Sequence, residues 1–136
     1  MIYPKNFEQK IGFTEVRSLL RERCLSPLGK EQVDAMTFST DAGQVNTWLE
    51  ETREFRRIQE EQDDFPLDHF FDMRESVSRI RLEGTHMEVE ELFDLKRSLE
   101  TIIAIVDFLS RGDETEQGET RPCYPALHAL ADGIAT

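Results

Sequence analysis

The fold is decided by the stretch EVEELFDLKRSLETIIAIVDFL, residues 88–109. Apolar side chains recur in it in steps of three and four, at Leu92, Leu95, Leu99, Ile102, Val106 and Leu109. Such spacing keeps one seam of a helix turned toward a partner helix. Further apolar residues make the second half of the stretch apolar nearly all round, which indicates deep burial or an additional partner: Phe93, Ile103, Ile105 and Phe108. We therefore expect a long helix that begins at Thr85 or Glu88 and ends at Gly112.

Helix-start signals divide the rest of the chain. Ser26 followed by Pro27 is typical of an N-cap and a first helical position, because serine accepts an orphan backbone N–H and proline has none to lose. Asp41 with Gln44 resembles a capping box, and the same pattern recurs at Asp72. Apart from the long helix, we expect a turn or short first helix over residues 6–11 and further helices over residues 14–24, 27–36, 41–62, 72–84 and 124–135.

Apolar side chains at helical spacing mark one face of several of these helices. The stripe of the second helix consists of Phe13, Val16, Leu19, Leu20 and Cys24. The expected buried face of the fourth consists of Val45, Trp48, Leu49, Thr52, Phe55 and Ile58. Between residues 63 and 71 we expect an ordered loop pinned to the core by its aromatic side chains, Phe65, Phe70 and Phe71. Residues 113–122 are polar and turn-rich, and no stretch alternates convincingly enough to predict a strand.

These patterns predict an all-α protein, a helical bundle or array with long antiparallel helices. Its 136 residues fit a single helical domain spanning residues 1–136. The last helical pattern has no clear stop signal before Thr136, so we expect the chain to be a piece of a larger protein.

Net charge argues against autonomous binding to nucleic acid. The chain has 28 acidic residues against 16 basic ones, a formal charge of −12. Duplex binding is driven by Lys and Arg replacing counterions along the phosphates, so tight DNA binding is not expected. Two local basic clusters have Glu residues at helical spacing nearby, which favours solvated helix faces over a phosphate-binding patch: Arg17, Arg21 and Arg23, and Arg53, Arg56 and Arg57.

The spacing of the cysteines and the composition of the N-terminus indicate the cellular compartment. Cys24 and Cys123 lie far apart in sequence, and the first residues contain no apolar stretch of signal-peptide length. The longest apolar run, residues 102–106, is far too short to span a membrane. We expect a cytoplasmic protein with free thiols and no membrane association; a structural disulfide is the alternative, and it requires the two Cα atoms to lie within about 7 Å.

No motif predicts catalysis, a cofactor or a metal. The densest polar group is Asp63, Asp64, Asp68, His69 and Asp72, and it lacks the fixed offsets and the glycine of a calcium loop. The histidines His69, His86 and His128 form no local ligand pair, and neither cysteine has a close partner. A GxxxxGK[ST] phosphate loop is absent from the sequence. Trp48 and Phe55 stand at helical spacing, which favours core packing over base stacking.

Two ordered stretches resemble a known family. Residues 24–58, CLSPLGKEQVDAMTFSTDAGQVNTWLEETREFRRI, are similar to the opening of the MutS core domain. Residues 70–103, FFDMRESVSRIRLEGTHMEVEELFDLKRSLETII, resemble the second bacterial paralogue of that family, MutS II. The resemblance covers nearly all of residues 5–110. It departs from the family at Phe38, where relatives often have proline, and in the loop 63–71, which matches no general pattern.

The resemblance implies a parent ATPase that dimerises, clamps nucleic acid between long lever helices and often carries a small nuclease-like domain. Such parents are associated with suppressing homologous recombination, processing branched DNA and rescuing stalled ribosomes. ATP and Mg²⁺ belong to the parent by this resemblance, and none of its catalytic motifs falls within this chain. We thus expect a non-catalytic part of the core and lever region, whose partners are a homodimer mate and downstream lever helices.

Two alternatives remain. One is a free-standing helical module that binds another protein through the Leu92 to Leu109 seam. The other is an unrecognised enzyme, which requires a pocket where histidines converge. Because the seam lacks a downstream partner in this chain, we also expect self-association through the last two helices.

Overall fold

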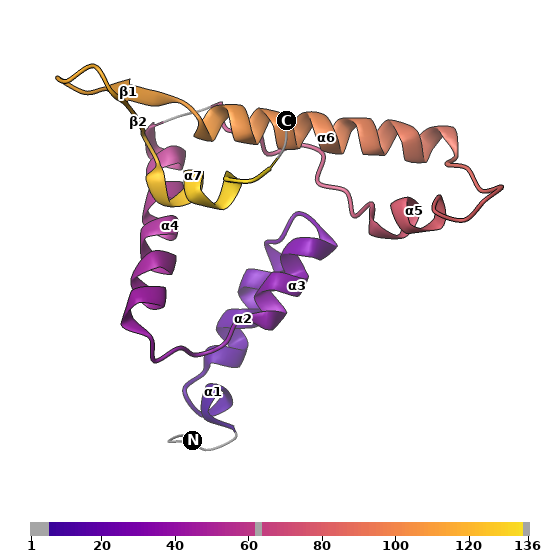
Figure 1. Ribbon diagram of the computed structural model, residues 1–136. Coiled ribbons are helices and arrows are strands. Elements are labelled where there is room, and N and C mark those ends of the chain that lie inside the picture. Colours follow the sequence, from indigo (N-terminus) through magenta and orange to yellow (C-terminus); the bar gives the residue numbers. More distant parts are fainter. Residues whose placement is uncertain (1–5, 62–63, 135–136) are drawn as a thin grey trace. The chain divides into compact units, whose positions relative to one another are not determined.

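The structure, a computed structural model, describes residues 6–61 and 64–134. Over these ranges it consists of seven helices and one pair of short strands (Figure 1). In chain order the elements are α1 Phe7–Lys10, α2 Phe13–Glu22, α3 Pro27–Ala35, α4 Ala42–Glu61, α5 Arg74–Arg79, α6 Val89–Leu109, β1 Gly112–Glu114, β2 Thr120–Pro122 and α7 Pro125–Ala131. The predicted helical fold class is confirmed. Gln62, Asp63 and Ala135, on which some expectations fall, lie outside the described residues.

Capping side chains explain where α3 and α4 begin. Ser26 Oγ accepts the Gly29 N–H at 3.3 Å, and Pro27 occupies the first turn. Asp41 Oδ1 accepts the Gln44 N–H at 3.2 Å, one residue before α4 begins. Each bond satisfies a backbone donor that has no partner within the helix. Both predicted helix starts are confirmed.

The start and end of α5 differ from the prediction. Met73 is the N-cap residue, and Asp72 Oδ1 accepts the N–H of Arg74 at 3.2 Å. Asp72 therefore lies one residue before the cap, where the Arg74 guanidinium also binds its carboxylate. The helix ends at Arg79 rather than near Gly84, whose φ of +82° belongs to the following turn.

A β-hairpin occupies the segment where no strand is predicted. Strands β1 and β2 pair antiparallel, with Gly112 opposite Pro122 and Glu114 opposite Thr120. Gly118 supplies a left-handed conformation, φ +78°, at the turn between the strands. Because each strand has three residues and β1 is exposed throughout, burial imposes no alternation of apolar and polar residues. The hairpin therefore has no hydrophobic signature in the sequence.

The chain forms two compact units. Unit 1 comprises residues 1–38 and 70–86, and unit 2 comprises residues 39–69 and 87–136. Unit 1 contains α1, α2, α3 and α5, and unit 2 contains α4, α6, α7 and the hairpin. The expectation of one domain over residues 1–136 stays a prediction.

Polar contacts hold the helices of unit 1 together. The Arg17 guanidinium on α2 donates to the Val33 carbonyl oxygen at 2.6 Å and pairs with the Glu8 carboxylate at 2.7 Å. Arg21 pairs with Asp34 at 3.1 Å. Much of the predicted α2 stripe remains exposed, with exposed fractions of 46, 52 and 41% at Val16, Leu19 and Leu20.

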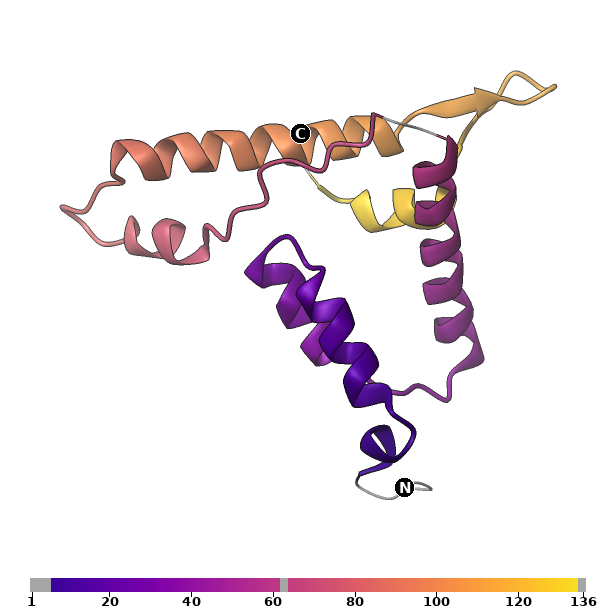
Figure 2. The same cartoon turned by 180° about the vertical axis from the view of Figure 1, so that it is seen from behind.

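The hydrophobic core of unit 2 lies where α4, α6 and α7 approach one another. Its buried residues are Ile58, Phe108, Leu109 and Tyr124. Helix α7 contacts both α4 and α6, and it lies beside α4 in both views (Figure 1 and Figure 2). The Phe65 ring packs edge-on against Phe55 and Phe108, with centroids 5.3 and 5.1 Å away. The predicted aromatic pinning of the loop is confirmed for Phe65.

The buried face predicted for α4 is correct only in its second half. Ile58 is fully buried and Phe55 is partly buried in the core. Trp48 and Leu49, in the first half, are 42 and 56% exposed. The first half of α4 extends beyond the core. Its apolar side chains are therefore exposed, whereas those near the other end of the helix are buried.

Helix α6 buries a different face from the predicted seam. The residues that become buried along its middle are polar, Ser98 and Thr101, and the Thr101 Oγ donates to the Asp68 carbonyl oxygen at 2.7 Å. Leu92 and Leu99 of the seam are 52 and 50% exposed. Leu109, in the last turn of α6, is the seam residue that is buried in the core. The periodicity correctly predicts a helix. The face of α6 that packs against other described residues is, however, largely not the apolar seam.

Candidate functional site

Metal binding and nucleophilic catalysis are chemistries of His, Cys, Asp and Glu side chains. Among the residues that the structure describes, no group of three or more His, Cys, Asp or Glu side chains is placed to hold a metal ion. Cys24 and Cys123 are both free. Desolvation, and secondarily Asp113, raise the pKa of the Cys123 thiol. A raised pKa keeps the thiol protonated, which disfavours nucleophilic chemistry there. No described helix is long and apolar enough to cross a membrane.

Glu54 is a buried carboxylate with a structural explanation. It lies on α4, and only 5% of the residue is exposed. Its Oε1 accepts the Ala126 N–H at 3.0 Å, and its Oε2 accepts the Leu127 N–H at 2.8 Å. These N–H groups belong to the first turn of α7, which has no cap of its own. Glu54 therefore caps α7 from 72 residues away in sequence, and both its oxygens are occupied.

The acidic group around the central loop is dispersed into separate contacts. Asp64 pairs with Arg111 at 2.9 Å, and Asp68 offers its backbone carbonyl to Thr101. Asp72 belongs to unit 1 and is bound by Arg74. Asp63 lies outside the described residues. Asp64, Asp68 and Asp72 are therefore engaged in different interactions.

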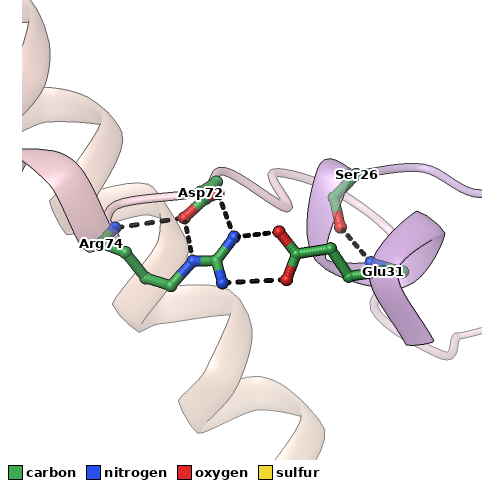
Figure 3. Close-up of polar contacts among 5 residues, drawn as sticks. Ser26, Glu31, Asp72 and Arg74 are labelled. Atoms are coloured by element: carbon green, nitrogen blue, oxygen red, sulfur yellow. Dashed lines mark hydrogen bonds and ion pairs between the residues drawn. The ribbon is translucent and has the colours of Figure 1, made fainter. Parts of the chain in front are cut away.

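A polar cluster that joins two helices of unit 1 centres on Arg74 (Figure 3). Its two terminal nitrogens donate to the Glu31 carboxylate at 2.9 and 2.6 Å. Its Nε and Nη2 donate to the Asp72 carboxylate at 2.9 and 2.7 Å. One guanidinium thus binds two carboxylates with paired hydrogen bonds, the geometry that suits its planar donors. Through these bonds α3 is attached to the start of α5.

Electrostatics in this cluster favour the charged forms. Hydrogen bonds from Arg74 hold the pKa of Asp72 at about 2, well below its usual value. The same guanidinium lowers the pKa of Glu31 against a smaller opposing effect of desolvation. Asp72, then Glu31, raise the pKa of Arg74. All three groups are charged at neutral pH, so the cluster is suited to attachment and not to proton transfer.

Sequence reasoning missed this cluster. Asp72 is predicted only as a helix cap, and neither Arg74 nor Glu31 is singled out. Arg74 and Glu31 are 43 residues apart, so no local spacing relates them. The only available signal is that Glu31 lies in the first stretch that resembles MutS and Arg74 lies in the second.

Most side chains of the two basic clusters lie on solvated faces as predicted, but that of Arg17 is only 17% exposed. Arg53 pairs with Glu50, Arg56 with Glu60 at 3.2 Å, and Arg57 with Glu61 at 3.3 Å. In the other cluster Arg17 and Arg21 pair with carboxylates, and Arg23 donates to the carbonyl of Leu19. Most of these guanidinium groups are thus already matched by acids, which leaves little unpaired positive charge for phosphate.

Comparison with known proteins finds similarity to one group of proteins. An Endonuclease MutS2 of Geobacillus sp. (strain WCH70) is 30% identical over 126 residues, 92% of this chain and 15% of that protein. Over most of its length the chain is similar to a part of MutS2. The MutS2 of Geobacillus kaustophilus is 35% identical over 85 residues, 62% of the chain and 11% of the relative. That of Alkaliphilus oremlandii is 24% identical over 126 residues, 93% of the chain and 15% of the relative.

These matches define how far the MutS2 relationship extends. The chain spans only 11 to 15% of the length of these three relatives. No family model matches the chain, and no solved structure matches it. The predicted resemblance to MutS II is confirmed by sequence. The endonuclease activity in the relatives' name belongs to proteins several times longer than this one.

The Arg74 cluster joins the two stretches on which the MutS resemblance depends. Glu31 lies in the first stretch, residues 24–58, and Asp72 and Arg74 lie in the second, residues 70–103. Both contribute to unit 1. The cluster therefore has a structural role within this MutS2-like segment: it attaches one motif to the other.

Proposed function

We propose that this chain is a non-catalytic helical scaffold segment of a MutS2-type protein. The observation that carries the proposal is the similarity to MutS2, which extends over 92% of the chain but only 15% of the relative. The polar clusters support it, because Glu54 and Arg74 are occupied in attaching helices. In this proposal ATP hydrolysis, Mg²⁺ binding and nucleic-acid cleavage belong to residues outside this chain.

The proposal extends to partners. The whole protein dimerises and acts on DNA or on the ribosome, in recombination or in ribosome rescue. This segment supports the downstream lever helices and makes no tight contact with phosphate, since its net charge is −12.

The test is a set of assays on the isolated chain. We expect no ATP hydrolysis, no cleavage of duplex or branched DNA, and a Kd for a fluorescent 30-base-pair duplex weaker than about 10 μM at 0.15 M salt. Sub-micromolar duplex binding under these conditions would contradict the scaffold assignment, as would turnover that survives repurification.

A second candidate function is a helical protein-interaction module. The exposed α6 seam favours it, because large apolar side chains remain uncovered there. The reading frame of the gene distinguishes the two. A downstream phosphate-loop ATPase supports the scaffold, and a stop codon directly after residue 136 supports the module.

A further inference from the structure

The negative charge of the chain is concentrated in unit 2. Unit 2 contains 20 acidic and 7 basic side chains, a net charge of −13. Unit 1 contains 8 acidic and 9 basic side chains, a net charge of +1. Together these account for the −12 of the whole chain. A partner that approaches unit 2 therefore meets a strongly acidic body.

Helix α6 of this unit presents an exposed apolar strip, here named the α6 face. It consists of Leu92, Leu99, Ile102 and Ile103, with exposed fractions of 52, 50, 42 and 46%. Spacings of three, four and seven residues place these side chains along one side of the helix. The buried Thr101 and Phe108 lie on the opposite side of α6, and Leu109, seven residues after Ile102, is buried where the strip ends. The α6 face is therefore not needed for the core of unit 2.

The charges beside the α6 face are acidic on balance. Helix α6 carries five acidic and two basic side chains. Both bases are paired within the helix, Lys96 with Glu100 at 3.6 Å and Arg97 with Asp94 at 2.8 Å. Asp107, also exposed, lies one turn beyond Ile103. The apolar strip is therefore accompanied by a net charge of −3 on its own helix.

Resting on the second candidate function, the protein-interaction module, we propose that the α6 face is a docking surface for a cationic amphipathic helix of another protein. Such a helix has an apolar ridge that covers the strip and Lys or Arg residues beside the ridge that face the acids of unit 2. Because unit 2 is negatively charged, a positively charged helix is favoured over a second copy of the chain. A second copy brings another unit of net charge −13, and like charges facing each other oppose association. Self-association through the last two helices stays a prediction and is the competing outcome of the test.

The binding test uses the whole chain and three fluorescent 18-residue peptides of defined chemistry. The first has leucine at helical spacing with lysine elsewhere, the second has the same leucines with glutamate, and the third is a scrambled leucine–lysine sequence with no apolar face. In anisotropy titrations at 0.15 M salt we expect the first to bind at least 10-fold more tightly than the other two. Equal binding of the glutamate peptide, or of the scrambled peptide, overturns the proposal.

Variants then locate the site. The double change Leu99→Ser and Ile103→Ser should weaken binding at least 10-fold, whereas Leu130→Ser on α7, 62% exposed, should leave it unchanged. Circular dichroism checks that each variant keeps its helices. Wild-type affinity in a folded double variant contradicts the proposed position.

A charge reversal provides an independent readout if the double variant does not fold. Asp107→Lys should weaken binding about threefold and reduce its dependence on salt. Glu116→Lys, an identical charge change in the exposed hairpin loop, should have less effect. Equal effects of the two reversals overturn the proposal. So does sedimentation that shows a dimer dissociated by the Leu99 and Ile103 changes, because the occupant is then a second copy.

Discussion

Glu54 illustrates how much one side chain contributes to unit 2. Its carboxylate accepts two N–H groups in the first turn of α7, and the residue is 5% exposed. We predict that Glu54→Gln lowers the free energy of unfolding by about 1–2 kcal/mol, since one of its two acceptor oxygens becomes a donor that faces another donor. Urea unfolding monitored by circular dichroism measures the change.

The matched control for this change is Glu60→Gln on the same helix. Glu60 pairs with Arg56 in an i,i+4 arrangement and is 62% exposed at its side chain. Surface pairs of this kind contribute about 0.5 kcal/mol or less. If the two variants lose equal stability, Glu54 does not act as the cap of α7.

The Arg74 cluster leads to a prediction about pH. Arg74 holds the pKa of Asp72 at about 2 and lowers that of Glu31. Carboxylates with depressed pKa values stabilise the folded state above their unfolded pKa of about 4, and this contribution is lost as pH falls toward the folded value. The window for Asp72 therefore runs from about pH 4 down to about pH 2.

We predict that Arg74→Met returns the Asp72 pKa toward about 4, because the hydrogen bonds that stabilise its anion are removed. Carboxyl-carbon NMR titration of Asp72 measures this directly. The control is Arg53→Met, which removes the pairing with Glu50 in the other unit and should leave the Asp72 titration unchanged. An unshifted Asp72 titration in the Arg74 variant contradicts the role assigned to that guanidinium.

Not all of these residues could be predicted from sequence. Ser26 and Asp41 are recognised because a cap acts within three residues of itself, so its signal is local. Glu54 and Arg74 act across 72 and 43 residues, and nothing in their neighbourhood distinguishes them from other charged residues on helices. Their roles depend on which helices meet, which is decided by tertiary packing.

At the scale of elements, the hairpin depends on the close approach of its strands. A Cβ added at Gly112 would lie 2.6 Å from the carbonyl oxygen of Arg121, a backbone atom in the partner strand. We predict that Gly112→Ala destabilises the fold by about 1–3 kcal/mol, because the strands must separate to admit the methyl group. Amide exchange of Cys123, whose N–H donates to the Arg111 carbonyl, should accelerate as well.

The control for the hairpin is Glu114→Ala in the same strand, an exposed residue. It removes surface charge without adding atoms between the strands, and it should not accelerate the Cys123 amide exchange. If Gly112→Ala exchanges no faster than this control, the strands do not approach as closely as the structure indicates.

The helices and the hairpin also differ in how far sequence could predict them. Helix α6 is recognised because apolar residues repeat along 21 residues, whereas β1 and β2 have three each. The same α6 pattern does not say what covers it: Leu99 is exposed, and Ser98 beside it is buried. Periodicity reports which face of a helix is apolar, and packing decides which face is covered.

At the scale of the whole molecule, charge is divided unevenly, with −13 on unit 2 and +1 on unit 1. Like charges within a compact body repel, and added salt screens this repulsion over a distance of about 10 Å at 0.1 M. Removing acids from unit 2 should therefore stabilise the chain at low salt. The same change in the nearly neutral unit 1 has no excess charge to relieve.

We predict that Glu114→Lys with Glu116→Lys raises the thermal midpoint of unfolding at 0.02 M salt by a few degrees, about 1 kcal/mol or less, and that most of the gain disappears at 0.5 M. Both residues are exposed, so the change alters charge and little packing. The matched change in unit 1, Glu15→Lys with Glu22→Lys, should give no comparable gain. Scanning calorimetry at both salt concentrations makes the comparison. An equal gain from either unit, or one that persists at 0.5 M, would mean that local contacts rather than the charge of unit 2 control the effect.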